Sequence, residues 1–426
     1  MIPAALIAKK RDGGELTSEE IAEFVAGYMT GSVADYQMSA WAMAVVLRGM
    51  TPSEIAALTS AMLHSGRALE RCTSKPRVDK HSTGGLGDKT SLIIAPLLAC
   101  LDLDVPMLSG RGLGITGGTL DKLEAFPGYR CDLTEEEIDR QLASVGCVIT
   151  GTTQNITPAD RRLYALRDVT GTVESVALIT ASIMSKKLAE SLDALVLDVK
   201  FGGAAFMQRL DDARELAGSL MRTGSAANVP TRALLTDMNQ PLGRMVGNAC
   251  EVNEALDMLR GEAPADLREV TLRLCAEVLL ALGRSSSIAE AILQLETELA
   301  SGRPLDRFRQ MVESQAGRFA DCLPTAPAAA LTAARSGYVR QLHGRSLGQA
   351  VVELGGGRKQ LGEAIDPSVG LEMLVRVGDR VDAGQEWIKV FSPPGARKDA
   401  AVRLLQKSIV IEDVPPEPLP LILEMS

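Results

Sequence analysis

The sequence offers little for a histidine-based metal site or for paired cysteines. It has only three histidines, His64, His81 and His343, which are too few and too far apart to bind a metal together. No CxxC pair occurs among its cysteines, which are Cys72, Cys100, Cys131, Cys147, Cys250, Cys275 and Cys322. An odd, scattered set of this kind predicts reduced and mostly buried thiols in a cytoplasmic protein.

Excess positive charge and long apolar runs are missing too. The formal net charge of −9 argues against a surface that neutralises many nucleic-acid phosphates, although a local basic pocket for a small anion is compatible with it. No apolar run approaches the length of a membrane span, and residues 1–10 lack the apolar core of a signal peptide. We therefore expect a soluble cytoplasmic protein that binds neither a membrane nor nucleic acid.

What the chain does have is enough apolar sequence for more than one core. It is 426 residues long, with 46% hydrophobic and 23% charged residues, which is typical of globular proteins. A single core rarely organises so many residues, so two or three domains are expected. A functional site would then lie in a cleft between domains.

The first seventy residues carry helix start signals. Thr17 and Glu20 form a capping box ahead of apolar residues at helical spacing. Thr51 and Glu54 repeat this pattern around Pro52, which suits the first turn of a helix. The pattern predicts an all-helical unit whose apolar stripes need a partner surface.

Beyond Arg77, apolar runs alternate with Gly-rich turns and helical patterns. The runs cover residues 91–101, 105–108, 147–150 and 194–199. This alternation predicts an α/β fold with a parallel sheet. After a Pro/Ala-rich boundary at 323–330, alternating segments at 371–377 and 386–391 predict a small β-rich C-terminal unit.

Residues 79–91, DKHSTGGLGDKTS, are the densest polar and Gly-rich stretch, and an apolar helix-like run follows them. Glycine N–H groups, hydroxyls and a helix N-terminus together favour binding of phosphate. Asp88 interrupts the Gly-Lys pair that a Walker A loop requires, so that motif is excluded. An ordinary Gly-rich turn is the structural alternative.

Residues 109–121, SGRGLGITGGTLD, contain a literal GxGxxG at Gly112, Gly114 and Gly117, so a dinucleotide-binding loop has to be considered. No clean βαβ unit places an acidic residue about twenty residues later, as a ribose-binding carboxylate would require. A turn that offers the hydroxyls of Ser109 and Thr119 to the same anion fits better.

Two further polar segments follow, RRLYALRDVT at 161–170 and SIMSKK at 182–187. Ser182 and Lys186 are four residues apart, so a helix would place them on one face, where they could meet one ligand. A solvated helix with surface lysines is the alternative. Among the histidines, His81 is best placed for proton chemistry, whereas His64 and His343 are expected to be structural or exposed.

Several segments taken together resemble the thymidine and pyrimidine nucleoside phosphorylase family, most closely its thymidine phosphorylases. They are KHSTGG at 80–85, SGRGLGITGGTLDKLE at 109–124, YALRDVT at 164–170, SIMSKKLAE at 182–190, LDVK at 197–200 and TDMNQPLG at 236–243. The resemblance implies phosphorolysis of pyrimidine 2′-deoxynucleosides in nucleoside salvage, thymidine and deoxyuridine above all, by a homodimer without an organic cofactor.

The resemblance also implies an α/β fold class with three domains: a small all-helical domain, a large mixed α/β domain with a central sheet, and a small β-rich α+β subdomain. The helical domain would hold the base and form the dimer, and the α/β domain would bind phosphate. The implied boundaries are 1–70 with 160–192, 71–159 with 193–325, and 331–426.

Site residues follow from the resemblance position by position. Phosphate would be bound by Lys80, Ser82, Ser91, Ser109 and Thr119. The base would be held by His81, Tyr164, Arg167, Ser182 and Lys186. Phosphate would attack the anomeric carbon with inversion, Arg167 and Lys186 would stabilise charge on the departing base, and His81 would donate a hydrogen bond or proton to the 2-carbonyl oxygen.

Two positions bear on specificity. Family members that accept ribonucleosides tend to have lysine where this chain has Met107, and an apolar side chain there would disfavour a 2′-hydroxyl. Ile115 replaces the usual histidine in a loop that is expected to face the base, which leaves the preferred base open. Some relatives hold a metal cation, and the matching positions are Gly87, Lys89, Leu242, Met245 and Glu254.

Three alternatives remain at this stage. A broad pyrimidine nucleoside phosphorylase would also accept uridine. A phosphoribosyltransferase of the anthranilate type shares Gly-rich phosphate loops, but the acidic pair for magnesium-bound pyrophosphate is not found in matching context. A catalytically inactive nucleoside-binding relative would keep the fold without the activity.

Overall fold

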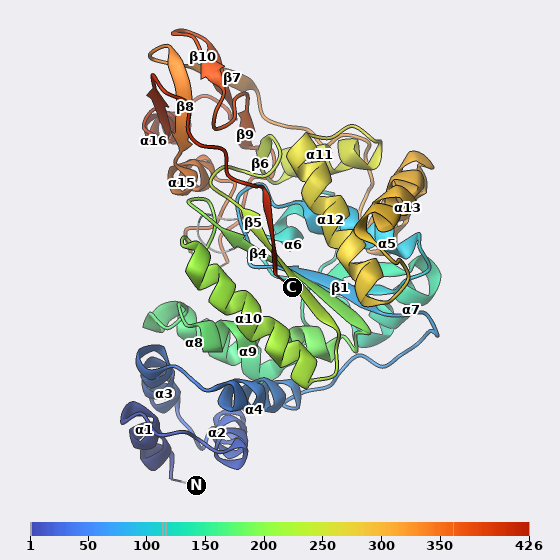
Figure 1. The fold of residues 1–426 in the computed structure, drawn as a ribbon, viewed down its shortest axis with the longest axis vertical. Helices are drawn as coiled ribbons and strands as arrows, with labels where there is room; N and C mark the ends of the chain where they lie inside the picture. Colours follow the sequence, from blue (N-terminus) through green and yellow to red (C-terminus); the bar gives the residue numbers. More distant parts are fainter. Residues whose placement is uncertain (1, 113–114, 116, 361, 426) are drawn as a thin grey trace.

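The computed structural model describes residues 2–112, 115, 117–360 and 362–425. A helical bundle lies at one end of the molecule, a sheet with flanking helices in the middle, and a β-rich unit at the other end (Figure 1). Within the described residues, no helix combines the length and apolar character that crossing a bilayer requires.

The helical bundle joins two parts of the chain that are far apart in sequence. Its helices are α1 (Pro3–Arg11), α2 (Ser18–Thr30), α3 (Asp35–Arg48), α4 (Pro52–Leu63), α8 (Pro158–Thr170) and α9 (Val176–Ala189). The capping boxes at Thr17 and Thr51 are confirmed at the starts of α2 and α4. Phe24 and Trp41 pack in a core that also contains Leu163 of α8 and Leu178 of α9. The N-terminal stripes therefore find part of their partner surface in α8 and α9.

The central sheet is mostly parallel. Its strands are β1 (Val78–Ser82), β2 (Val105–Leu108), β3 (Cys147–Thr150), β4 (Ala194–Phe201), β5 (Thr231–Asp237) and β13 (Ile422–Met425). β1, β4 and β5 pair in parallel, as do β2 and β3, and a hydrogen bond from the Val78 N–H to the Asp104 carbonyl links the two groups. β13 is antiparallel to β5, so the last strand of the predicted C-terminal unit lies at the edge of this sheet.

Helices cover both faces of the sheet, as a parallel sheet requires. They are α5 (Thr90–Ala99), α6 (Thr119–Leu123), α7 (Glu135–Val145), α10 (Leu210–Ala226), α11 (Ala249–Leu259), α12 (Ala265–Ala281), α13 (Ile288–Ala300) and α14 (Arg303–Ser314). In β4, Leu195 and Leu197 face the core shared with α9 and α10, whereas Ala194 and Val196 face the core shared with α5 and α12. Both side-chain rows are therefore buried, which explains the continuous apolar run.

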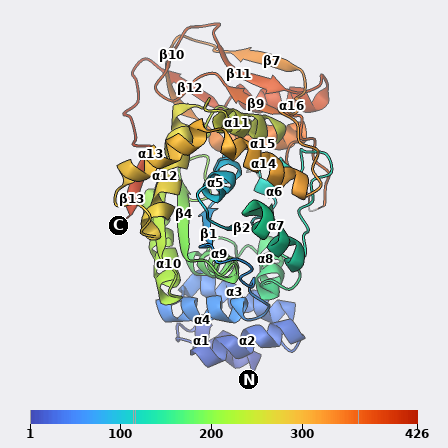
Figure 2. The same cartoon turned by 90° about the vertical axis from the view of Figure 1, so that its right-hand side faces the viewer.

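The C-terminal unit lies beyond the sheet, opposite the bundle (Figure 2). Its elements are β7 (Ala328–Thr332), β8 (Gly337–Leu342), α15 (Gly344–Leu354), β9 (Gly370–Met373), β10 (Arg380–Val381), β11 (Glu386–Phe391), α16 (Ala396–Leu405) and β12 (Ile409–Glu412). β6 (Met245–Gly247), from the middle of the chain, pairs with β9 and ties this unit to the α/β layer. The predicted fold class, helices followed by an α/β layer and a β-rich unit, is confirmed.

Candidate active site

Strand β1 sends polar side chains to both faces of the sheet. Side chains alternate along a strand, so Lys80 and Ser82 lie on one face and Asp79 and His81 on the other. The Lys80 Nζ lies 3.4 Å from the Ser91 Oγ in α5, whereas Asp79 pairs with Lys187 of α9. One short strand thus supplies residues toward the α/β layer and toward the helical bundle.

Lys80 lies in a buried group of opposite charges. Its Nζ is 3.8 Å from the Asp88 carboxylate and 3.9 Å from that of Asp198. Burial lowers the pKa of Lys80, although Asp88 and Asp198 favour its charged form. Burial also disfavours the Asp88 carboxylate, but Lys200 and Lys80 outweigh it and hold its pKa well below the usual range. The structure thus brings Lys80 and Ser91 together, as predicted, inside a charged cluster.

The two acidic partners of Lys80, Asp88 and Asp198, had no role in the site predicted from the sequence. Lys200 lies 2.7 Å from the Asp198 carboxylate, and the Thr236 hydroxyl donates to Asp198 at 2.6 Å. Two charged residues in an otherwise apolar buried strand were the available signal for this part of the site. Because parallel α/β sheets bind ligands beyond the carboxyl ends of their strands, this edge is the expected place for an anion.

The other predicted phosphate residues lie at or next to the ends of β1, β2 and α6. The Ser82 Oγ accepts a hydrogen bond from the Gly84 N–H at 3.1 Å. Ser109 directly follows β2, and Thr119 begins α6. The structure records no direct contact of Ser109 or Thr119 with Lys80 among the described residues. Gly114, the middle glycine of the GxGxxG pattern, lies outside the residues that the structure describes.

On the helical side, Ser182 and Lys186 meet as their spacing predicted. The Lys186 Nζ donates to the Ser182 Oγ at 3.0 Å and forms an ion pair with Asp160 of α8. Tyr164, one turn further along α8, is 40% exposed, which leaves its ring accessible to a ligand. The role of Asp160 was missed, because its contact with Lys186 joins two separate helices.

Arg167 has a different environment from the one expected of a base ligand. Its guanidinium is buried and donates to the backbone carbonyls of Thr172 (3.1 Å), Leu178 (3.1 Å) and Val173 (2.7 Å). Burial lowers the pKa of Arg167, against the raising effect of Asp160. In this conformation Arg167 holds the connection between α8 and α9, and its contact with a base stays a prediction.

His81 lies between the two sides of the site. Burial and the positive charges of Lys187, Lys186 and Lys80 together hold its pKa well below 6.5. Its imidazole is therefore neutral near pH 7. A neutral imidazole donates a hydrogen bond to a carbonyl oxygen but has no extra proton to transfer. Of the two roles predicted for His81, the hydrogen bond is therefore favoured over proton donation.

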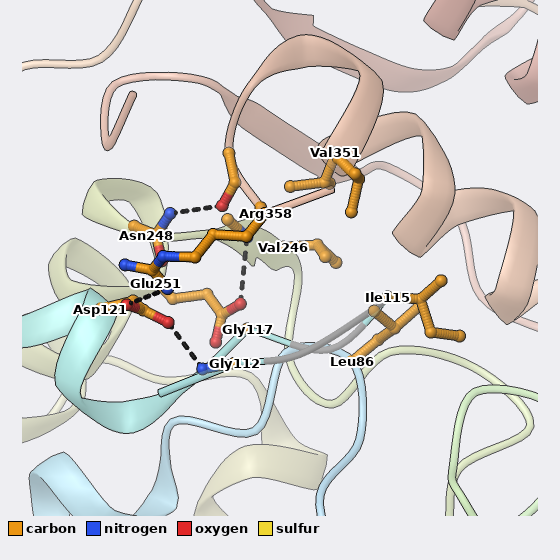
Figure 3. A pocket seen from close by; sticks show the side chains of 14 residues that line it. Leu86, Gly112, Ile115, Gly117, Asp121, Val246, Asn248, Glu251, Val351 and Arg358 are labelled. Carbon is orange, nitrogen blue, oxygen red and sulfur yellow. Dashed lines mark hydrogen bonds and ion pairs between the residues drawn. The ribbon is translucent and has the colours of Figure 1, made fainter. Parts of the chain in front are cut away.

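Met107 and Ile115, the two predicted specificity positions, lie in different surroundings. Met107 is 1% exposed and belongs to the main core, as expected for a residue inside buried strand β2. Ile115 lines a small pocket with Leu86 and Val351, on the side of the C-terminal unit (Figure 3). A Cβ atom at Gly348 of α15 would lie only 2.8 Å from the Ile115 Cβ. That Ile115 faces the base stays a prediction.

The same pocket shows how the C-terminal unit contacts the Gly-rich loop. Arg358 donates to the Asp121 carboxylate at 2.7 Å, and Asp121 in turn accepts from the Gly112 N–H at 2.7 Å (Figure 3). The Asn248 side chain donates to the Gly356 carbonyl at 2.8 Å. Asp121 of α6 thus connects Gly112 to Arg358, and Asn248 contacts the same segment of the chain after α15.

The five positions predicted to hold a metal cation do come together, but Lys89 occupies their centre. Its ammonium contacts the carbonyls of Leu242 and Met245 and the carboxylate of Glu254. Burial lowers the pKa of Lys89, yet Glu254 and Glu251 outweigh it, so the pKa is raised. Within the part of the chain that the structure describes, no three His, Cys, Asp or Glu side chains form a metal-binding group.

Three models of known protein families match successive parts of this chain. Residues 4–66 match the helical bundle domain of a glycosyl transferase family, and residues 74–305 match the α/β domain of that family. Residues 338–412 match a pyrimidine nucleoside phosphorylase C-terminal domain. The three matches follow one another along the chain, and α8 and α9 of the bundle lie within the second of them.

Individual relatives are similar over nearly their full length. A thymidine phosphorylase of Agrobacterium fabrum is 45% identical, covering 98% of this chain and 97% of the relative. A pyrimidine-nucleoside phosphorylase of Staphylococcus aureus is 43% identical, covering 96% of each. The crystal structure of an anthranilate phosphoribosyltransferase from Thermus thermophilus has a TM-score of 0.59 and 21% identity, covering 73% of this chain and 99% of that one, which shows a shared fold alone.

Proposed function

Because the chain belongs to the glycosyl transferase family of thymidine and pyrimidine-nucleoside phosphorylases, we propose that it cleaves pyrimidine nucleosides with inorganic phosphate. As a member of that family it is a pentosyltransferase. The observation that carries the proposal is the position of His81 in β1, next to Lys80 in sequence and on the strand face from which Asp79 pairs with Lys187 of α9. Lys80 could then bind an anion on one side of His81, and Lys186 could bind a nucleoside base on the other side.

The proposed reaction uses these groups in a single displacement. Lys80 and Ser91 bind phosphate, whose oxygen forms a bond to the anomeric carbon as the bond to the base nitrogen breaks. The electron pair of that bond leaves with the base, so negative charge develops there. Lys186 stabilises this charge and neutral His81 donates a hydrogen bond to a carbonyl oxygen. The product is an α-sugar 1-phosphate, and phosphate is the only co-substrate required.

We propose a preference for 2′-deoxynucleosides, which rests on the resemblance at Met107. An apolar residue at this position offers no partner for a 2′-hydroxyl, and an unpaired buried hydroxyl disfavours binding by about 1–3 kcal/mol. Thymidine and deoxyuridine should therefore react about 5- to 150-fold faster than uridine. Chromatography of the free base, with and without phosphate, measures all three substrates. Equal rates with uridine would contradict the sugar preference, and release without phosphate would contradict phosphorolysis.

We also propose that two copies pair through the outer face of α3, in the cytoplasm. Tyr36 and Leu47 of this helix are 76% and 74% exposed, and Met43 lies between them on the same helical face. All seven cysteines are unpaired, which suits a reducing compartment.

In sedimentation velocity at micromolar concentration we expect a dimer for the unmodified protein and a monomer for Leu47→Glu. Leu293→Glu, which changes an equally apolar exposed residue on α13, should leave the dimer intact; dissociation by both variants or by neither would contradict this interface.

A further inference from the structure

Lys89 occupies a closely fitted position between the start of α5 and the chain that precedes α11. Its ammonium donates to the carbonyl oxygens of Leu242 (2.9 Å) and Met245 (3.1 Å) and to the carboxylate of Glu254. The Lys89 side chain is fully buried. An ammonium group has three N–H donors, so these three oxygens satisfy all of them.

The surrounding backbone closes tightly around this ammonium. Gly243 has a left-handed φ of +71°, and a Cβ atom there would lie 3.0 Å from the Lys89 Nζ. A Cβ atom at Gly87 would lie 2.5 Å from the Leu242 carbonyl oxygen. Both glycines allow the chain to approach the ammonium more closely than a larger residue would permit.

The same oxygens would be good ligands for a metal cation. Backbone carbonyls and carboxylates are the groups that hard cations prefer, and the sequence predicted a metal at these five positions. The residues present do not fit that ion. Lys89 already places a positive charge at the centre of the oxygens, and a metal ion would have to displace it or lie beside it in a buried, poorly screened position.

We propose that the Lys89 ammonium is an internal cation that takes the place of a bound metal ion. It fixes the N-terminal end of α5 against residues 242–245 and against α11. Ser91 is two residues further along α5 and lies 3.4 Å from the Lys80 Nζ, so this connection also sets the geometry of the phosphate-binding residues. The folded protein therefore needs no dissolved cation for its stability or its activity.

An ordinary buried ion pair would behave differently from an internal cation when the lysine is removed. Loss of an ion pair leaves a buried carboxylate that no particular dissolved ion restores. Loss of an internal cation leaves a cavity lined by three oxygens, which a K⁺ or NH₄⁺ ion of suitable size can enter. Selective rescue by small cations therefore distinguishes the two cases.

The test compares the unmodified protein with Lys89→Thr in potassium chloride and in tetramethylammonium chloride at equal ionic strength. For the unmodified protein we expect the same Tm, within about 1 °C, and the same kcat/KM in both salts. For Lys89→Thr we expect a Tm at least about 5 °C lower in tetramethylammonium, with most of the loss recovered in potassium because the ion binds only the folded state. Its kcat/KM should fall about tenfold and recover in parallel.

Lys89→Met is the matched control, since it removes the charge but fills the cavity with an apolar chain, and it should show no potassium response. A potassium-dependent Tm in the unmodified protein, or a folded Lys89→Thr without selective rescue, would overturn the proposal. If Lys89→Thr does not fold in either salt, Lys89→Ala in ammonium chloride takes its place: a higher Tm than in tetramethylammonium supports the proposal and an unchanged Tm overturns it. The Tm comparison does not depend on which reaction the enzyme catalyses.

Discussion

Lys186→Ala is expected to lower kcat/KM for thymidine about 10²- to 10³-fold, the usual effect of removing a charge-stabilising donor from an active site. The Lys186 ammonium comes from α9, donates to Ser182 and lies close enough to His81 to lower its pKa. Its charge would stabilise the base as the glycosidic bond breaks. Most of the loss should therefore appear in kcat when initial rates are measured at saturating phosphate.

A structural explanation for that loss has to be separated from a chemical one. Removing Lys186 leaves the buried Asp160 carboxylate without its ion-pair partner, so the variant should also have a lower Tm. Asp160→Asn combined with Lys186→Ala removes both charges and should restore much of the Tm but none of the activity. Arg161→Ala, at an exposed position of α8, is the control for surface charge. Recovery of activity in the double variant would show that Lys186 acts only through folding.

Lys80→Ala is expected to abolish productive phosphate binding, with a decrease in kcat/KM for phosphate of about 10²-fold or more. The buried Lys80 ammonium lies 3.4 Å from the Ser91 Oγ. Without it, the carboxylates of Asp88 and Asp198 would repel the phosphate dianion. Removing the positive charge therefore weakens binding and also exposes the ligand to repulsion.

Thermal shift in phosphate separates this binding effect from general damage. Phosphate that binds only the folded state raises stability by RT ln(1 + [L]/Kd), about 2.7 kcal/mol at a hundredfold excess over Kd. The unmodified protein should show a phosphate-dependent rise in Tm, and Lys80→Ala should not. Lys398→Ala, at a partly exposed position of α16, should respond as the unmodified protein does. An unchanged phosphate response in Lys80→Ala would remove Lys80 from the phosphate site.

Local signals in the sequence predicted many elements well. Capping boxes at Thr17 and Thr51 mark the starts of α2 and α4, and the apolar runs at 105–108 and 147–150 coincide with β2 and β3. These signals depend on neighbouring residues alone. The pairing of β13 with β5 and of β6 with β9 depends on contacts between distant parts of the chain, so no local pattern could predict it.

In the candidate site too, features that depend on neighbouring residues were predictable and features that depend on distant contacts were not. The contact of Ser182 with Lys186 follows from helical spacing and was predictable, whereas the ion pair of Lys186 with Asp160 joins two helices and was not. The orientation of Arg167 toward backbone carbonyls depends on the turn between α8 and α9. The resemblance predicted Lys89 as one of five metal-binding positions, but only the folded structure shows that its own ammonium lies among the oxygens of Leu242, Met245 and Glu254.

The most direct test of the central claim is ³¹P NMR of the protein with thymidine and inorganic phosphate. The proposed displacement consumes one phosphate for each thymine released and inverts the anomeric carbon. We therefore expect the phosphate resonance to be replaced by that of 2-deoxy-α-ribose 1-phosphate, in a one-to-one ratio with thymine. Release of thymine without consumption of phosphate, or formation of the β-anomer, would contradict the account.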